Sequence, residues 1–305
     1  MNSGSSFRAY AALLFAMLVW GLSFLAIKDA IDIVPIFSLL FIRFLLAAVF
    51  LGLWVGRQRS VRLPKRDLLG LAGISLLSPI GYFLFETFGI AHTQPSHVSV
   101  IIATIPLAVF LIAFLRRQEQ PTWKKTLGIL TAYAGVLSLI GLGRRDVGAS
   151  LFGDLLIFGA VLCAAFRTSL IKDVLKRVTP LQLTFYQFFF SLFVFAPLAA
   201  TDGAGWMSRL TALSVLEILF LGIFCSAGAF LAMHYALTHL AATQVAVSAN
   251  LIPAITLFAE AMLFRAPLTS AKLVGTGLVI GGVLLTQRTH ATRRPTSLGV
   301  PERGG

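Results

Sequence analysis

Ten apolar segments, each about 20 residues long, divide this chain of 305 residues, and their length restricts the fold more than any other feature. A helix needs about 20 apolar residues to cross the hydrocarbon core of a bilayer. Membrane-spanning strands would instead alternate in polarity over segments of about ten residues. The sequence therefore predicts an all-α membrane protein with ten transmembrane helices, at 9–28, 34–56, 68–90, 95–115, 123–142, 151–171, 180–200, 213–237, 243–264 and 270–287.

The residue composition agrees with a chain that lies largely in lipid. Hydrophobic residues make up 57% of it and charged residues 12%, whereas a soluble domain is about 25% charged. The net charge of +13 would suggest a nucleic-acid partner for a soluble protein, but basic cytoplasmic loops explain it here. We therefore expect membrane lipid as a partner and no nucleic acid.

The basic residues also predict the orientation of the chain. If the N-terminus is inside, the inner segments hold 17 Lys and Arg and the outer segments hold 6. Because cytoplasmic loops carry an excess of Lys and Arg, both termini are predicted to be cytoplasmic. The basic segment 288–305 is predicted to be a disordered tail near the membrane surface.

The chain contains an internal repeat. Residues 81–137 align with residues 228–284 without gaps at a constant offset of 147, and the identical pairs include His92/His239, Pro106/Pro253, Gly128/Gly275 and Gly135/Gly282. Arg43 aligns with Gln187 at an offset of 144. One unit holds five helices, an odd number, so the second unit is inverted relative to the first. We expect repeats at 9–142 and 151–287, the arrangement of alternating-access carriers whose site lies near the midplane.

Several stretches resemble one transporter family. They are Leu18 to Phe24 with Lys28, Arg43-Phe44, Glu119 with Thr122-Trp123, and Asn250 to Pro253. Together with ten spans and a repeat, they are similar to the EamA family of the drug/metabolite transporter superfamily. The resemblance implies an inverted five-plus-five bundle in the bacterial inner membrane, with a cavity lined by helices 1, 3, 4, 6, 8 and 9. It also implies export of amino acids or other metabolites.

Polar side chains within the spans are the first candidates for substrate contacts. Tyr82 and Glu86 share one stripe of the third helix, where Glu86 could bind an amine, carry a proton or form a structural ion pair. Asn250 could bind a substrate or join two helices. Thr104 lies two residues before Pro106, in the first repeat's counterpart of this segment.

Aromatic and proline residues supply further candidates. Trp20 and Phe24 lie one turn apart on the first helix, where they could form an apolar wall for a substrate or pack in the core. Pro253 cannot donate to the carbonyl of Ala249, and Pro106 has the equivalent place in the first repeat. We interpret the two prolines as hinges or gates beside a central cavity, with static kinks as the alternative.

Charged residues deep in the spans need partners or water. Arg43 is the deepest, and we expect it to be a structural charge paired with Glu86 or Glu260. Glu86, Glu260 and His234 are the candidates for proton coupling, although His234 could simply be hydrogen-bonded. Arg167 is predicted to lie about one turn from the cytoplasmic surface and to reach it with its side chain.

These features predict a secondary active transporter that exports small organic solutes, coupled to protons as an antiporter or uncoupled. The sequence has no G-x-x-x-x-G-K-[ST] pattern, and none of H-E-x-x-H or G-x-S-x-G, so no cofactor, metal or enzymatic activity is expected. An uncoupled facilitator or channel, a membrane sensor and an intramembrane enzyme are the alternatives. The expected partner is a small-molecule substrate, and the oligomeric state is open, with a monomer compatible.

Overall fold

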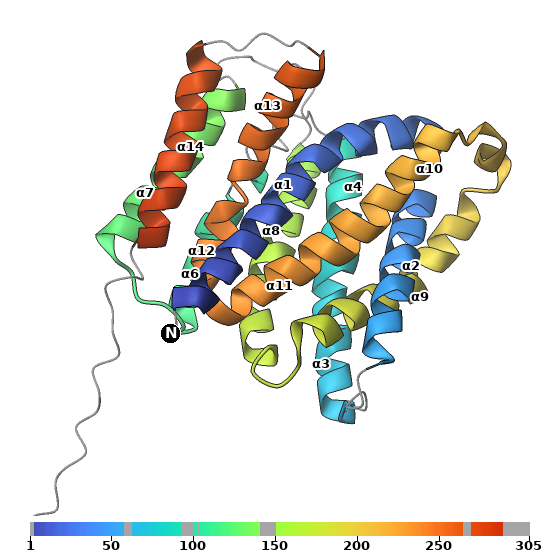
Figure 1. The fold of residues 1–305 in the computed structure, drawn as a ribbon, viewed down its shortest axis with the longest axis horizontal. Helices are drawn as coiled ribbons and strands as arrows, with labels where there is room; N and C mark the ends of the chain where they lie inside the picture. The colour runs from blue at the N-terminus through green and yellow to red at the C-terminus, as the bar shows by residue number, and fades with distance from the viewer. Residues whose placement is uncertain are drawn as a thin grey trace, which may run out of the picture.

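The computed structural model describes residues 3–57, 63–92, 101–102, 104–140, 151–264 and 270–288, and these residues are helical apart from short turns (Figure 1). The first half contains α1 (Ser3–Ile33), α2 (Ile36–Val55), α3 (Lys65–Ser75), η1 (Leu76–Gly81), α4 (Tyr82–His92), α6 (Ile105–Leu115) and α7 (Trp123–Ile140). The second half contains α8 (Leu151–Val174), α9 (Pro180–Thr201), η2 (Gly205–Arg209), α10 (Ala212–Leu219), η3 (Phe220–Gly228), α11 (Ala229–His239), α12 (Ala242–Ser248), α13 (Leu251–Phe264) and α14 (Ser270–Arg288).

The helices occupy the ten predicted ranges, so the prediction of an all-helical membrane protein is confirmed. Six of the described helical segments are long and apolar enough to cross a membrane, and two shorter apolar helices cover Ile105–Leu115 and Leu273–Thr286. The predicted start of the fourth span, 95–100, and the predicted tail beyond residue 288 lie outside the described residues.

Local sequence signals set several helix ends. Thr179 and Gln182 form a reciprocal capping box at the start of α9, and Pro180 takes the first helical position. Thr211 and Ser214 form the equivalent pair at the start of α10. These side chains satisfy backbone N–H groups that a helix start leaves without partners, so they define where each helix begins.

The third and eighth spans each contain a wide π-helical turn that the sequence did not predict. In the third span this turn, η1, contains Pro79 and a non-helical residue, Ser78. In the eighth span the turn is η3. The two turns end at Gly81 and Gly228, which are 147 residues apart. The interruption is therefore a feature of both halves.

The helices pack as pairs that combine the two halves. Helices α7 and α14 lie side by side at one edge of the bundle, and α2 packs on α9 toward the other edge (Figure 1). Between these pairs, α1 packs on α11 and α13, while α8 packs on α4 and α6. The centre of the molecule is thus built from α1, α4, α8 and α11, two helices from each half.

Candidate functional site

Tyr82 and Glu86 lie at the centre of this arrangement, one turn apart on α4. The Tyr82 hydroxyl donates a hydrogen bond of 2.8 Å to Glu86 Oε1. Both residues are half-buried, so the carboxyl group has a polar partner without being sealed from the surroundings. The sequence placed these two residues on one stripe, and the structure brings them into direct contact.

Arg43, on α2, extends its guanidinium toward the same helix. Its Cζ lies 6.0 Å from the centre of the Phe83 ring, a cation–π distance. The guanidinium interacts electrostatically with Glu86. However, the described residues provide no ion-pair partner for Arg43, and its buried Nε has no hydrogen-bond partner. The side chain of Glu260, the other expected partner, lies outside the described part of the chain.

Arg167 and His234 form a second buried polar group, between α8 and α11. Arg167 is 8% exposed and His234 is fully buried. The sequence predicted that the Arg167 side chain would reach the surface, but it lies in the interior. Its Nη1 lies 3.5 Å from His234 Nε2, and its Cζ lies 5.8 Å from the Phe230 ring centre. His234 Nδ1 is 2.8 Å from Thr184 Oγ1. Helix α8 packs on α4 and α6, and this arginine is buried in the interior.

Arg167 is the site residue that sequence reasoning missed. Its guanidinium lies against the Phe230 ring, just as that of Arg43 lies against the Phe83 ring. Besides the hydrogen-bonded pair on α4, the interior therefore holds two buried arginines, one from each half of the molecule. An arginine inside a span was itself a signal that could have suggested this position.

Trp20 supports the site from α1. Its Nε1 donates to the Cys225 carbonyl at 3.1 Å, and its ring meets Phe230 edge-on with centroids 5.2 Å apart. The carbonyl that it satisfies belongs to the wide turn η3. Trp20 therefore both packs in the core and borders the polar cluster. The side chain of Phe24 lies outside the described residues.

The helix containing Pro253 is interrupted rather than simply kinked. Helix α12 ends at Ser248, and α13 begins at Leu251, so the proline occupies the first turn of a new helix. The Ala249 carbonyl, which the proline cannot reach, accepts a 3.0 Å hydrogen bond from Ile252 N. Asn250 lies in the interruption; it is 4% exposed, and its Nδ2 has no hydrogen-bond partner.

The first half has the same construction. Pro106 lies in the first turn of α6, which begins one residue after Thr104. The Thr104 hydroxyl donates a 2.6 Å hydrogen bond to the Ile101 carbonyl, three residues earlier in the chain. Both prolines thus follow breaks at equivalent places in the two halves. The side chain of Pro253 itself lies outside the described residues.

A separate polar network joins the two halves at one end of the bundle. Lys125 Nζ forms a 2.8 Å ion pair with Glu119 Oε2, and both side chains are buried. Glu119 Oε1 accepts a 3.1 Å bond from Thr243 N at the start of α12. In the same loop, Gln118 accepts a 2.6 Å hydrogen bond from Ser169 of α8. The α6–α7 loop of the first half is thereby tied to two helices of the second.

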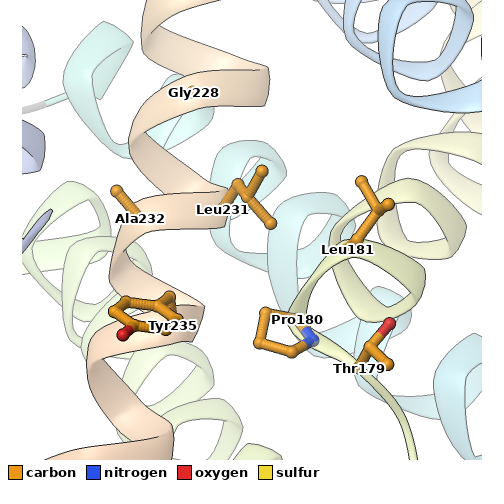
Figure 2. Close-up of a pocket in the computed structure, with 7 residues that line it drawn as sticks. All are labelled: Thr179, Pro180, Leu181, Gly228, Leu231, Ala232 and Tyr235. Carbon is orange, nitrogen blue, oxygen red and sulfur yellow. The ribbon is translucent and has the colours of Figure 1, made fainter. Parts of the chain in front are cut away.

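An apolar pocket of about 440 Å³ lies between the start of α9 and α11. Figure 2 shows its lining, with Leu181 and Pro180 on one side and Leu231 and Tyr235 on the other. None of the polar candidates lines it. The pocket suits hydrocarbon rather than a polar solute, so we place the candidate site in the Tyr82–Glu86 cluster instead.

Comparison with known proteins agrees with this architecture. The model of the EamA-like transporter family matches residues 7–141 and 151–288, nearly the whole chain in two copies. The chain belongs to this family. Its family places it among multi-pass membrane transporters, which confirms the prediction of a transporter rather than an enzyme. It also implies that the substrate is a small molecule.

Individual relatives give the same result. An uncharacterized transporter of Archaeoglobus fulgidus is 29% identical, covering 95% of this EamA-like chain and 100% of its own. A probable terminal-alkyne amino-acid exporter of Streptantibioticus cattleyicolor is 25% identical, covering 94% and 96%. A solved structure, titled only as a crystal structure of a protein, has a TM-score of 0.76 at 18% identity and covers 94% and 98%. That likeness shows the fold.

Proposed function

We propose that this EamA-like protein is a secondary active transporter of the bacterial inner membrane. It exports small organic solutes, amino acids or related metabolites, by alternating access of two inverted repeats. The observation that carries the proposal is the polar cluster at the centre of the bundle, which lies between helices contributed equally by the two halves. The similarity to a probable amino-acid exporter supports this substrate class.

Close contacts between α7 and α14 support inversion of the repeats. Gly128 approaches Thr286 and the carbonyl of Gly282, while Gly135 approaches Val279 and the carbonyl of Gly275. Gly128 aligns with Gly275 and Gly135 aligns with Gly282. Each glycine therefore meets the counterpart of the other. This is the pattern of two antiparallel helices related by a two-fold axis.

The rest of the packing repeats this relation. The contact of α1 with α11 has its counterpart in the contact of α8 with α4. The contact of α1 with α13 likewise corresponds to that of α8 with α6. Two equivalent halves around a central site favour alternating access, in which one half moves against the other.

At the helix breaks, such movement has a low free-energy cost. A break frees the following segment from the continuous hydrogen-bond ladder of a helix, so it can tilt at low cost. The breaks before Pro106 and Pro253 lie at equivalent positions, beside Thr104 and the buried amide of Asn250. We propose that α6 and α13 act as paired gates, and that Thr104 and Asn250 contact the solute.

Proton coupling is assigned in this proposal chiefly to Glu86. Its carboxyl group is half-buried at the central cluster and can change its hydrogen bond to Tyr82 when it gains a proton. His234 is fully buried and already contacts Thr184 and Arg167, which makes it the weaker candidate. Glu260 is kept as the third candidate. The excess of basic residues in the predicted inner segments supports a cytoplasmic location of both termini in this proposal.

Transport by the purified protein in liposomes tests this proposal. We would measure uptake of radiolabelled amino acids and metabolites with and without an imposed pH gradient, for the wild type and Glu86→Gln. The expected result is saturable movement of one solute class that depends on the gradient and loses this dependence in the variant.

Two other results would change the proposal. Saturable transport that ignores the gradient in the wild type would indicate an uncoupled facilitator. Movement of no solute by correctly folded protein would contradict transport itself and favour a sensor. Folding would be checked by gel filtration and by the helical circular dichroism of the reconstituted sample.

A further inference from the structure

We propose that Arg43 and Arg167 form an anion-binding site, and that this protein carries small organic solutes with a net charge of −1 through a carboxylate group. This inference rests on the proposed transport function, because it names the substrate class of the same central site. It follows from the contacts that the two arginines make and from the charges around them.

The internal repeat shows that Arg43 does not make the hydrogen bond that its counterpart makes in the other half. Its counterpart Gln187 donates a 2.8 Å hydrogen bond to the carbonyl of Ser78 in the wide turn η1. In the other half the corresponding carbonyl, that of Cys225, is already satisfied by Trp20 Nε1. Arg43 therefore has the position of a residue that makes a structural hydrogen bond in the other half. In its own half, Trp20 makes the corresponding bond.

The guanidinium of Arg43 is consequently left available. The residue is 5% exposed, its Nε is buried with no hydrogen-bond partner, and no described carboxylate pairs with it. A buried cation without a partner is costly. A cation–π contact with Phe83 at 6.0 Å compensates only part of that cost.

Arg167 is in a similar state on the other side of the cluster. Its Nε is also buried without a partner. Its other nitrogens make only long contacts, 3.5 Å to His234 Nε2 and 3.9 Å to Met233 Sδ. Neither partner carries a negative charge, so the contacts orient this guanidinium without neutralising it.

The described charges of the cluster add up to an excess of one positive charge. With Glu86 in its ionised form, the cluster holds two guanidinium groups and one carboxylate, which accepts the hydrogen bond of Tyr82. A solute of net charge −1 would balance the site, whereas a neutral or cationic solute would leave it charged in a poorly solvated environment. Carboxylate is the natural partner because guanidinium binds it through two parallel hydrogen bonds.

An amino acid with an acidic side chain matches these groups in number and sign of charge. Its two carboxylates could each approach one arginine, and its ammonium group could approach Glu86. A simple monocarboxylate would satisfy the charge balance with one contact only. Glutamine, the side-chain amide of glutamate, would have the same shape without the required negative charge.

Glutamate and glutamine therefore form a matched pair of probes, with lactate as a monocarboxylate and lysine as a cation. We would measure counterflow in proteoliposomes and the thermal stabilisation of the purified full-length chain by each probe. Glutamate or lactate should be transported and should stabilise the protein, at least about tenfold more strongly than glutamine or lysine. Arg43→Gln and Arg167→Gln should each lose this preference, while Arg57→Gln, at an exposed position, should keep it.

Each result leads to a definite conclusion. If glutamine or lysine is transported, and stabilises the protein, as well as glutamate or better, the anion site is overturned but the proposed transport is not. Anion stabilisation that requires both arginines, without transport of any probe, would support the site and overturn the proposed transport. Response to no probe in either assay would overturn the anion site, and transport itself would then be decided by the wider solute panel described above. If the Gln variants fail to fold, Arg43→Lys and Arg167→Lys should show a weaker glutamate preference, and an unchanged preference would contradict the inference.

Discussion

Lys125 Nζ lies 2.8 Å from Glu119 Oε2, and both side chains are almost fully buried where the α6–α7 loop meets α12. The second oxygen of Glu119 accepts the Thr243 N–H, so the carboxylate has partners on both sides. One carboxylate thus links the two repeats of the protein at one end of the bundle. Because the pair is buried, removal of one partner would leave the other charge without a neutralising group and would lower the stability of the protein.

Removal of the lysine should therefore destabilise the protein strongly. In Lys125→Met the Glu119 carboxylate is left buried and unpaired, which costs about 3–5 kcal/mol. The measurement is the unfolding temperature in detergent. The exposed neighbour provides the control, since Lys124→Met should unfold like the wild type. An unfolding temperature in Lys125→Met equal to that of the wild type would show that the ion pair contributes nothing.

The same carboxyl group predicts a pH dependence of stability. Burial raises the pKa of Glu119, but the hydrogen bond and charge of Lys125 and the bonds from Thr243 outweigh it, so the pKa is lowered overall. In the unfolded chain, the side chain of a glutamate has a pKa of about 4.3. The contribution of Glu119 is complete above that value and is lost as the pH falls through the lower pKa of the folded state.

Wild type and Glu119→Gln should therefore differ most in unfolding temperature near neutral pH, and the difference should shrink in acid. Unfolding curves from about pH 7 to about pH 3 would measure it. A difference that stays constant over this range would mean that the carboxylate charge has no part in the effect.

Glycine at the contact of α7 and α14 is required by backbone proximity. A Cβ at Gly282 would clash with the backbone nitrogen of Ala132, whereas a Cβ at the adjacent Gly281 would meet no atom within 4 Å. Gly282→Ala should force the helices apart and cost about 1–3 kcal/mol. Gly281→Ala is the matched control and should change stability by less than about 0.5 kcal/mol. Similar unfolding temperatures of the two variants would contradict this close packing.

Trp20 is half-buried and combines a hydrogen bond with an aromatic contact, and two variants separate these roles. Trp20→Phe keeps a ring against Phe230 but loses the bond to the Cys225 carbonyl, and should cost about 0.5–1.5 kcal/mol. Trp20→Ala also loses the packing and should cost about 3–5 kcal/mol. The unfolding temperatures of both would be compared. Equal losses would show that the ring packing is unimportant.

The helical segments could be predicted from the sequence because their signals are local. The expected span 180–200 corresponds to α9 at Pro180–Thr201, since a run of apolar residues, a proline and a capping threonine lie next to one another in the chain. The wide turns η1 and η3 were not predicted. Their backbone depends on partners far away in sequence, such as Gln187 for Ser78 and Trp20 for Cys225.

The candidate site was predicted only in part for the same reason. Tyr82 and Glu86 are one turn apart on a single helix, so their contact follows from helical spacing. Arg167 was expected at the surface, although it lies against His234 in the interior. The expected ion pair of Arg43 with an acid is not formed with any described residue. Each of these outcomes depends on how one helix rotates and packs against another.

The sequence by itself determined that this is a membrane protein, how many spans it has and which repeat relates its two halves. These properties follow from segment length, polarity and self-similarity, which are read along the chain. Only the tertiary structure decided which charges are neutralised and which are left free. The neutralisation of a buried charge depends on a few ångströms between side chains of different helices, and no pattern within one helix contains that distance.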